Sequence, residues 1–461
     1  MKELSTFTHI YFIGIGGIGM SALARYFNEK SFQVLGYDKT PSSITDDLIK
    51  EGIKIHFEDL KEKVVNFFPN KESTLVIYTP AIPKDFGELL CFQKEQFHIL
   101  KRAQVLGLIT LQSKGIAVAG THGKTTTSTM LSHILHLSHL KCSAFLGGIS
   151  SNYNSNYISS FQSEYTVIEA DEFDKSFLQL RPFAAIITST DPDHLDIYGN
   201  SNNFLEGFQQ FANLIDKKGL IMLKKGLNIK SEVKTYTYSV SEKADYMVNK
   251  VFIENGKFYI DIIGPDFKWE KVELGLPGIH NAENALATVG VCLFLGLGEK
   301  QIRNGLNTFK GVKRRFEYQL KEKEVIYIDD YAHHPTEINA LFESVKLLYP
   351  NQKITAIFQP HLFSRTRDFL DAFAKVLSLF DNLLLLPIYP ARELPIEGVN
   401  SDELLKKCTN RNKFLTKNVK EIETALEKIP NGVFLTIGAG DIDRLITNIK
   451  TFLLNKIDYV D

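Results

Sequence analysis

The chain of 461 residues is 44% hydrophobic and 23% charged, and its formal net charge is −1. This length predicts about three domains with buried cores, while the near-zero charge gives no support for a protein that binds nucleic acid or an anionic membrane. The cysteines show no paired spacing, so we predict neither a zinc site nor a disulfide framework and expect a reducing cytoplasm; they are Cys91, Cys142, Cys292 and Cys408.

An apolar segment near the N-terminus, residues 9–24, has some of the character of a secretory signal. Its glycines fall at turn spacing and a helical pattern follows them, which argues against that interpretation. No other uncharged apolar run approaches the roughly 18 residues that a membrane helix needs. We therefore predict that the protein does not insert into a membrane.

The first hundred residues alternate between strand and helix patterns, which predicts a parallel sheet. Strands are predicted at 9–15, 33–37 and 74–79, and a helix at 20–29. A second start of this kind is a buried strand at 115–119 followed by a helix at 125–139. In that helix Met130, Ile134 and Leu137 fall at i, i+4 and i+7, so we expect them to form an inward stripe.

The remaining patterns complete this second unit and begin a third. Strands are predicted at 165–170, 184–189, 325–329, 354–358, 382–387 and 433–437. Residues 242–273 differ, because they alternate and are punctuated by glycine, and we expect antiparallel strands inserted late in the second unit. Three strand-turn-helix starts predict three α/β domains, which we place at 1–102, 103–310 and 311–461.

A glycine-rich turn lies between the first strand and its helix, with glycines at Gly14, Gly16, Gly17 and Gly19. Glycines let the backbone approach a pyrophosphate, and the helix N-terminus supplies positive partial charge. Asp38 follows at the distance expected of an acid that meets a ribose hydroxyl. Alone, the turn favours NAD or FAD, but a nucleotide sugar and a turn required only for packing both stay open.

A phosphate-binding loop is the stronger signal, and it reads Gly120-Thr121-His122-Gly123-Lys124-Thr125. It lies between a strand and a helix, so backbone N–H groups can cradle phosphates while Lys124 reaches the β- and γ-oxygens and Thr125 reaches Mg²⁺. The general pattern would place its first glycine at Val118, so this loop is shortened. A purely structural turn is disfavoured, because packing does not require Lys-Thr at a helix start.

Two predicted strands of the second unit end in polar segments. The first continues as Glu169-Ala-Asp171-Glu172-Phe-Asp174, and the second ends in a segment that places His194 among three acids. Ligands of parallel sheets bind beyond the carboxyl ends of the strands, and clustered acids repel one another unless a cation is present, so we predict Mg²⁺ there. A solvated acidic loop and a structural histidine are the alternatives.

Three later segments carry further candidate residues. The amides of His280-Asn281-Ala-Glu283-Asn284 suit a base edge, although an ordinary helix cap explains them equally well. Lys313-Arg314-Arg315 is either a surface cluster or a phosphate clamp. In the third unit, two strand ends combine opposite charges, which suits an anionic ligand better than core packing; their residues are Asp329, Asp330, Tyr331, His333, His334, His361, Ser364, Arg365, Arg367 and Asp368.

Taken together and in this order, these segments resemble the Mur ligases over essentially the whole chain. The segments are GIGGIGM, GTHGKTTT, EADEFDKSF, DPDHLDIYG, GIHNAENALA, GVKRRFE, DDYAHHPTEI and FQPHLFSRTRD. The shortened phosphate loop is a feature of this family and of the related folate ligases. The resemblance implies an α/β protein with an N-terminal Rossmann-like UDP-binding domain, a central P-loop ATPase domain with a parallel sheet and a small antiparallel insertion, and a C-terminal Rossmann-like domain.

The resemblance is strongest to the branch of the family that adds L-alanine to UDP-N-acetylmuramate. It implies a cytoplasmic ligase of peptidoglycan precursor synthesis that uses ATP, with Mg²⁺ as cofactor, and joins L-alanine to the lactyl carboxylate through an acyl phosphate. It also implies a monomer or weak homodimer.

The family's functional positions carry over onto matching residues of this chain. The resemblance implies catalytic roles for Lys124, His194, Arg315, His333 and Arg365. ATP would contact Gly120, Thr121, His122, Gly123, Lys124, Thr125, Thr126, His280, Asn281, Asn284, Arg315 and Asp330. The UDP-sugar would lie on Gly14, Gly16, Gly17, Gly19 and Asp38. Magnesium ions would be served by Thr125, Glu169 and His194.

The chain departs from the family pattern at two positions. The family often has Asn where Ser189 stands, and a basic residue is common where Leu362 stands, which leaves more of the amino-acid carboxylate to Arg365. Sister ligases for later peptide positions use a carbamylated lysine soon after the DH motif. Residues 195–216 contain no lysine, which agrees with the alanine-adding branch.

Four other functions compete with this one. A recycling ligase would join a preformed tripeptide to the same nucleotide sugar, and a folate-type ligase is a more distant relative. A nicotinamide dehydrogenase would use the first glycine turn but leaves the phosphate loop unexplained. A non-catalytic nucleotide-binding regulator would explain both loops but not the series of carboxylates and histidines.

Overall fold

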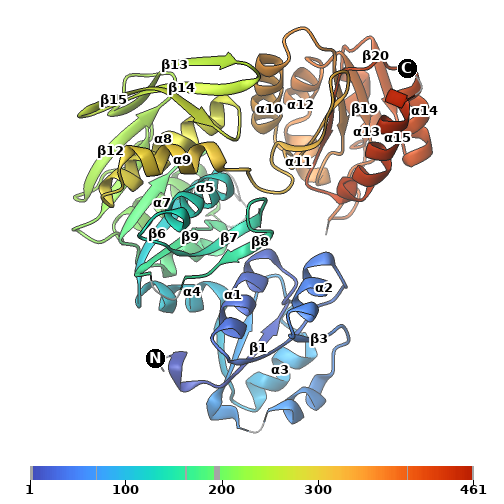
Figure 1. Ribbon diagram of the computed structural model, residues 1–461. Coiled ribbons are helices and arrows are strands. Elements are labelled where there is room, and N and C mark those ends of the chain that lie inside the picture. The colour runs from blue at the N-terminus through green and yellow to red at the C-terminus, as the bar shows by residue number, and fades with distance from the viewer. Residues whose placement is uncertain (1–3, 69, 161–162, 192–197, 392, 459–461) are drawn as a thin grey trace. The chain divides into compact units, whose positions relative to one another are not determined.

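The computed structural model describes residues 4–68, 70–160, 163–191, 198–391 and 393–458 (Figure 1). The chain divides into two compact units. The first contains Met1–Val251, Ile260–Leu274 and Glu283–Lys310, and the second contains Phe252–Tyr259, Gly275–Ala282 and Gly311–Asp461. Within the described ranges, no helix has both the length and the apolar character needed to cross a membrane.

The N-terminal sheet is parallel and has the strand order β3-β2-β1-β4-β5. Its strands are β1 (His9–Ile13), β2 (Gln33–Tyr37), β3 (Lys54–His56), β4 (Thr74–Tyr78) and β5 (His98–Lys101). The accompanying helices are η1 (Leu4–Thr6), α1 (Ile18–Glu29), α2 (Ser43–Lys50), η2 (Lys61–Phe67), η3 (Lys71–Ser73), α3 (Gly87–Lys94) and α4 (Arg102–Thr110). The chain builds outward from β1 in one direction and then returns to place β4 on its other side. This reversal is the kind of switch point at which open α/β sheets bind ligands.

The central sheet has the order β15-β14-β13-β12-β11-β10-β6-β9-β7-β8. Its strands are β6 (Lys114–Ala119), β7 (Ser143–Ser150), β8 (Ser155–Ile158), β9 (Tyr165–Glu169), β10 (Ala184–Ile187), β11 (Leu220–Lys224), β12 (Lys234–Ser239), β13 (Tyr246–Glu254), β14 (Lys257–Gly264) and β15 (Phe267–Leu274). In the order of the sheet, every neighbouring pair between β13 and β7 is parallel. The edge pair of β7 and β8 is antiparallel. The helices are α5 (Lys124–Leu137), η4 (Phe173–Gln179), α7 (Ser201–Ala212), α8 (Ile279–Phe294) and α9 (Glu299–Thr308).

The C-terminal sheet has the order β16-β17-β21-β18-β19-β20, parallel except for the β16–β17 pair. Its strands are β16 (Glu317–Lys321), β17 (Ile326–Asp330), β18 (Ile354–Phe358), β19 (Asn382–Leu385), β20 (Asn412–Leu415) and β21 (Val433–Ile437). Its helices are α10 (Pro335–Leu348), α11 (Phe363–Asp368), α12 (Leu370–Leu377), α13 (Ser401–Lys407), α14 (Val419–Glu427), η5 (Asp441–Leu445) and α15 (Ile446–Asp458). Buried strands β18 and β21 form its centre.

The predicted three-sheet α/β architecture is confirmed, and the strands predicted at 33–37, 354–358 and 433–437 have the bounds of β2, β18 and β21. The predicted inward stripe on α5 is wrong at Leu137, which is 46% exposed, although Met130 and Ile134 are buried. The cause is that α5 packs against the sheet on one side and α9 on the other. Its residues are buried all round as far as Leu135, and the helix then ends.

Candidate functional site

The glycine turn after β1 has a backbone that side chains would disrupt. Gly14 has φ +86°, and a Cβ added there would lie 2.7 Å from Cγ2 of Thr79. The N–H of Gly16 donates to Oδ2 of Asp38 at 2.7 Å. Gly17 caps the N-terminus of α1 without a side-chain hydrogen bond, so N–H groups of the first turn can serve a bound anion. Asp38 therefore fixes the turn that the sequence assigns to a pyrophosphate.

A cavity of about 260 Å³ lies beside this turn. The glycine turn lines it through Gly17 and Gly19, and the central sheet contributes Gly147 of β7 and Glu169 at the end of β9. All of these residues belong to the first compact unit. The predicted UDP-sugar turn and a predicted magnesium ligand thus face one cavity, which neither motif reveals by itself.

The phosphate loop after β6 is held by the end of the neighbouring strand β10. Gly120 has φ +133°, and an added Cβ would lie 2.1 Å from Oγ1 of Thr188. Ser189 accepts hydrogen bonds from the N–H of His122 at 2.8 Å and, through its carbonyl, from the N–H of Thr121 at 3.3 Å. Ser189, which stands where the family often has Asn, therefore anchors this loop.

The loop ends at Gly123, which is the N-cap of α5 and lies in the left-handed region with φ +81°. An added Cβ there would lie 3.0 Å from Oδ1 of Asn284, so this predicted ATP residue lies against the loop. Thr125 and Thr126 begin α5 and are buried. The predicted loop residues of the first unit are thus assembled at one helix start.

Lys124 does not point into solvent. Its Nζ donates to both carboxylate oxygens of Glu172 at 2.9 Å and to the carbonyl of Gly120 at 2.6 Å. The Lys124 and Glu172 side chains are only 14% and 3% exposed. Burial lowers the pKa of Lys124, but Glu172, Glu169 and Asp171 outweigh it and raise the pKa above the usual value, so the amine stays charged. For Glu172, burial raises the pKa, although the charge of Lys124 opposes this effect.

Glu172 was not among the predicted site residues, although the acidic run that contains it was noted. Its carbonyl accepts a hydrogen bond from the hydroxyl of Tyr198 at 2.7 Å, which fixes this part of the segment. Glu169 accepts a hydrogen bond from the N–H of Gly147 at 3.0 Å. His194 lies outside the described residues. Within the part of the chain that the structure describes, no group of three or more His, Cys, Asp or Glu residues is arranged to hold a metal ion.

The second unit contains the other predicted nucleotide residues. His280 lies at the start of α8, with Nδ1 3.3 Å from the hydroxyl of Ser344, and burial followed by the nearby Arg315 lowers its pKa to about 4. Asn281 is buried and donates to the carbonyl of Pro277 at 2.7 Å. The amide of Asn281 therefore ties the first turn of α8 to the chain that precedes the helix.

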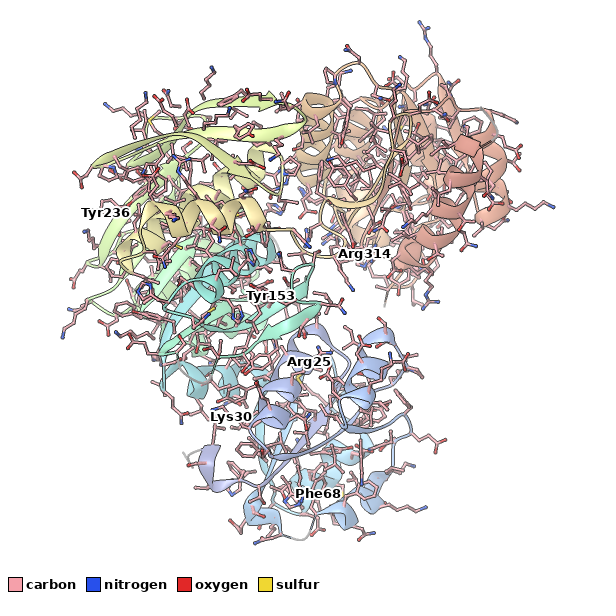
Figure 2. All side chains as sticks on the ribbon, in the orientation of Figure 1. Arg25, Lys30, Phe68, Tyr153, Tyr236 and Arg314 are labelled. Atoms are coloured by element: carbon pink, nitrogen blue, oxygen red, sulfur yellow. The ribbon has the colours of Figure 1, made fainter. Side chains whose placement is uncertain are left out.

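The two adjacent arginines before β16 have different surroundings. Arg314, labelled in Figure 2, pairs with buried Asp329 at 3.3 Å and donates to the carbonyl of Gly438 at 2.6 Å. Arg315 lies over the ring of Tyr331, 5.0 Å from its centroid. Arg314 thus joins β17 to the end of β21, and Arg315 is the arginine of the pair with the smaller structural role.

Asp330, at the end of β17, accepts hydrogen bonds from two backbone N–H groups. The donors are Phe316 at 2.7 Å and Ala332 at 2.8 Å. Burial raises the pKa of Asp330 to about 6 despite the opposing charge of Arg315. This carboxylate is therefore oriented by the backbone on both sides of the strand end.

A cluster of basic and imidazole groups lies at the ends of β17 and β18. Nη1 of Arg365 is 3.3 Å from Nδ1 of His361, and the His361 and His333 rings are 6.0 Å apart. Burial, followed by His333 and Arg365, lowers the pKa of His361 to about 4. Burial also lowers the pKa of His333, although Glu337 opposes it. Arg365 therefore carries the positive charge of this cluster near neutral pH.

Hydrogen bonds at its first residues fix the direction of α11. Leu362 has φ +72°, a strained value for a side chain of this size, and its N–H donates to the carbonyl of Tyr389 at 2.9 Å. Glu393 accepts hydrogen bonds from the N–H and the hydroxyl of Ser364. Tyr389 and Glu393 were not predicted from the sequence, because no spacing links them to the Arg365 segment.

Three family models match this chain along its length. Residues 9–114 match the Mur ligase family, catalytic domain; residues 118–292 match the Mur ligase middle domain; and residues 314–440 match the Mur ligase, glutamate ligase domain.

Full-length relatives carry the same description. The chain is 48% identical to a UDP-N-acetylmuramate–L-alanine ligase of Parabacteroides distasonis, with 99% of each chain covered. It is 49% identical to one of Flavobacterium psychrophilum, covering 98% of this chain and 100% of the relative.

Solved structures give the same comparison at the level of the fold. The UDP-N-acetylmuramate–alanine ligase of Thermotoga maritima is 29% identical, with a TM-score of 0.81 over 98% of this chain and 100% of that one. A murein peptide ligase of Psychrobacter arcticus is 22% identical, with a TM-score of 0.68 over 97% and 98% of the two chains, and is similar in fold.

Proposed function

This chain belongs to the Mur ligase family, and we propose that it joins L-alanine to the lactyl carboxylate of UDP-N-acetylmuramate at the expense of ATP, in peptidoglycan precursor synthesis. The observation that carries the proposal is the near-complete alignment, at 48% identity, with a relative described as this ligase. The alignment leaves no domain of the relative unmatched. We also propose that the enzyme works in the cytoplasm, as a monomer or weak homodimer, as the resemblance to the family implies.

The reaction must activate a carboxylate, which is a poor electrophile. The lactyl carboxylate attacks the γ-phosphorus of ATP, ADP leaves, and an acyl phosphate forms. The amine of alanine then attacks the acyl carbon, phosphate leaves, and the nitrogen loses a proton. Phosphoryl transfer depends on charge neutralisation and positioning more than on covalent chemistry by the protein.

Lys124 supplies the central positive charge for that transfer. Its position at the start of α5, between the loop carbonyls and Glu172, supports this assignment because the ammonium is already desolvated and charged. Arg315 carries the second charge assigned to the phosphates. His280, Asn281, Asn284 and Asp330 are assigned to the nucleoside end of ATP.

Mg²⁺ is the cofactor that this chemistry requires, and the residues present fit it. The Thr125 hydroxyl and the Glu169 carboxylate are oxygen donors, the type that Mg²⁺ prefers. The N–H of Gly147 orients the Glu169 carboxylate at the end of β9. These two residues, with His194, would hold the ion, and its charge would offset that of the phosphates.

The amino acid is assigned to the cluster around Arg365. The guanidinium can bind the alanine carboxylate, while His333 is neutral near pH 7 because burial lowers its pKa, and so it can accept the proton released by the amine. The UDP-sugar is assigned to the glycine turn at Gly14–Gly19, with the cavity beside it leading to Glu169.

The assay that tests this function measures ADP release from purified protein with MgATP. Release should require UDP-N-acetylmuramate and L-alanine together, and the product should be UDP-N-acetylmuramoyl-L-alanine. If the rate of ADP release did not depend on either compound, the result would instead indicate the nucleotide-binding regulator or another ligase. The recycling ligase would respond to a preformed tripeptide in place of alanine.

A further inference from the structure

Arg102 occupies a position that none of the sequence motifs identified. It is the first residue of α4, directly after β5, and its side chain is 20% exposed. Its Nη2 pairs with Oδ2 of Asp171 at 3.2 Å. Asp171 belongs to the acidic segment after β9, so Arg102 connects the N-terminal sheet to the strand end that carries Glu169.

The guanidinium of Arg102 lies against the first turn of α1. A Cβ added to Gly19 would lie 2.4 Å from its Nη1 and 3.1 Å from its Cζ. Gly19 is therefore needed for more than the backbone of the turn, because any side chain there would displace the guanidinium. The two features that bind anions best, a helix N-terminus and an arginine, are placed together.

The cavity beside the turn has an excess of acidic groups that Arg102 offsets in part. Glu169 and Asp171 line it, and Arg102 is the only cationic residue among its described lining residues. A diphosphate brings further negative charge to the same place, and the N–H groups of the turn offset it only partly. A cationic side chain within hydrogen-bonding reach would strengthen diphosphate binding, and among the described lining residues that side chain is Arg102.

We propose that Arg102 is a substrate-binding residue that donates hydrogen bonds to the diphosphate of UDP-N-acetylmuramate, and that its ion pair with Asp171 is not required for this binding. This inference rests on the proposed function, because it takes the nucleotide sugar as the ligand of the glycine turn. Two other roles are open to the same residue. Arg102 could bind the lactyl carboxylate, or it could serve only as the structural partner of Asp171.

Calorimetric titration of the full chain with UDP-N-acetylmuramate and with UDP distinguishes these roles. UDP carries the diphosphate but lacks the sugar and the carboxylate. Arg102→Ala should weaken both ligands by roughly 10- to 100-fold, the range expected for hydrogen bonds to charged groups. Arg102→Lys should recover part of the loss, since it restores a charge but not the planar fork. The KM for ATP should stay near the wild-type value, which also reports correct folding.

Two neighbouring variants serve as controls. Asp171→Asn removes the ion pair but leaves the guanidinium. Its affinity for UDP-N-acetylmuramate should be no more than about threefold below that of wild type, because a charge that repels the diphosphate is lost. Lys101→Ala removes an adjacent cation that pairs with Asp174 at 2.8 Å and does not line the cavity, and it should bind both ligands normally.

Three results would overturn the inference. Wild-type affinity in Arg102→Ala would remove Arg102 from binding. Loss of UDP-N-acetylmuramate binding with unchanged UDP binding would assign Arg102 to the carboxylate, and an equal loss in Asp171→Asn would make the ion pair structural. Failure of the wild-type protein to bind UDP-N-acetylmuramate at all would contradict the proposed function itself, which separates the two failures.

Discussion

At the scale of single residues, Lys124 is the group to which we assign the largest part in phosphoryl transfer. Its ammonium is charged, desolvated and fixed at the start of α5. Lys124→Ala should lower turnover by on the order of 100-fold or more, the cost of removing one preorganised donor from a transition state. Steady-state ADP release measures this effect. Lys141→Ala, an exposed lysine just beyond the same helix, is the matched control and should leave turnover unchanged; a Lys124 variant with more than about a tenth of wild-type turnover would contradict the assigned role.

Glu172 gives a second prediction at this scale. In Glu172→Gln the buried Lys124 loses its counter-charge, which should destabilise the protein by ~3 kcal/mol, as for other broken buried ion pairs. Because nucleotide phosphates can replace that charge, MgADP should raise the melting temperature of the variant more than that of wild type.

Thermal unfolding with and without MgADP measures this difference. Glu164→Gln is the control, because Glu164 pairs with Lys114 at 3.1 Å on the surface and no change in the nucleotide shift is expected. An equal MgADP shift in Glu172→Gln and wild type would mean that Lys124 keeps its position without Glu172.

The sequence identifies Lys124 as a candidate site residue but does not single out Glu172, and the reason is physical. A lysine at a fixed place in a strand-loop-helix unit has its direction set by the backbone, so the motif is enough. The acidic run leaves β9 at Glu169 and then turns irregularly, with Asp174 and Lys175 at φ +53° and +54°. Spacing alone therefore cannot tell which carboxylate of the run meets the lysine. Glu393 and Tyr389 escape prediction for the same reason, because only folding brings them to the Arg365 segment.

At the scale of elements, the predicted strands are accurate where both faces are buried. β18 and β21 are buried at every position, so a run of apolar residues broken only by one threonine in each strand defines their bounds. The α5 stripe is less accurate, because contact with both the sheet and α9 buries the helix on several sides and removes the amphipathic signal. The strands expected at 242–273 are present, and β13 extends the main sheet by pairing in parallel with β12.

The start of α8 supplies an element-scale prediction through His280. Its folded-state pKa of about 4 is below the usual 6.5, so the native state binds fewer protons than the unfolded state between these values. The stability contributed by the neutral imidazole is complete above pH 6.5 and is lost as the pH falls towards 4. Wild type should therefore lose up to about 2 kcal/mol more than His280→Asn between pH 7 and pH 5.

Melting temperatures of both proteins at pH 7 and pH 5 measure this difference. The Asn side chain keeps a polar partner for Ser344 but does not titrate, so the comparison isolates the imidazole. Parallel decreases of the two melting temperatures would show that His280 titrates normally.

At the scale of the whole molecule, three strand-turn-helix starts are enough to predict three sheets, but they do not predict how compact units form. The first two sheets share one unit. Asn156 of β8 is fully buried and donates to the Ile18 carbonyl and the Ser21 hydroxyl of α1, while Arg25 donates to its side-chain carbonyl. These contacts join distant segments that carry no motif, so sequence patterns cannot reveal them, and the domain boundaries at 102 and 310 remain predictions.

The proposed sequence of reaction steps predicts a trappable intermediate. If the lactyl carboxylate is phosphorylated before alanine reacts, hydroxylamine added to enzyme, MgATP and UDP-N-acetylmuramate without alanine should yield a hydroxamate. Mass spectrometry of the nucleotide sugar detects it. The Lys124→Ala variant is the control and should form little. Normal turnover with alanine but no hydroxamate would argue for a different route of carboxylate activation.

The most direct test of the proposed function is a competition between amino donors. Enzyme, MgATP and UDP-N-acetylmuramate are mixed with equal concentrations of L-alanine and a preformed cell-wall tripeptide, and the products are separated by mass. We predict that UDP-N-acetylmuramoyl-L-alanine accounts for nearly all product, because the site around Arg365 is assigned to one small amino acid. A mixture dominated by the tripeptide product would contradict this account and identify the chain as a recycling ligase.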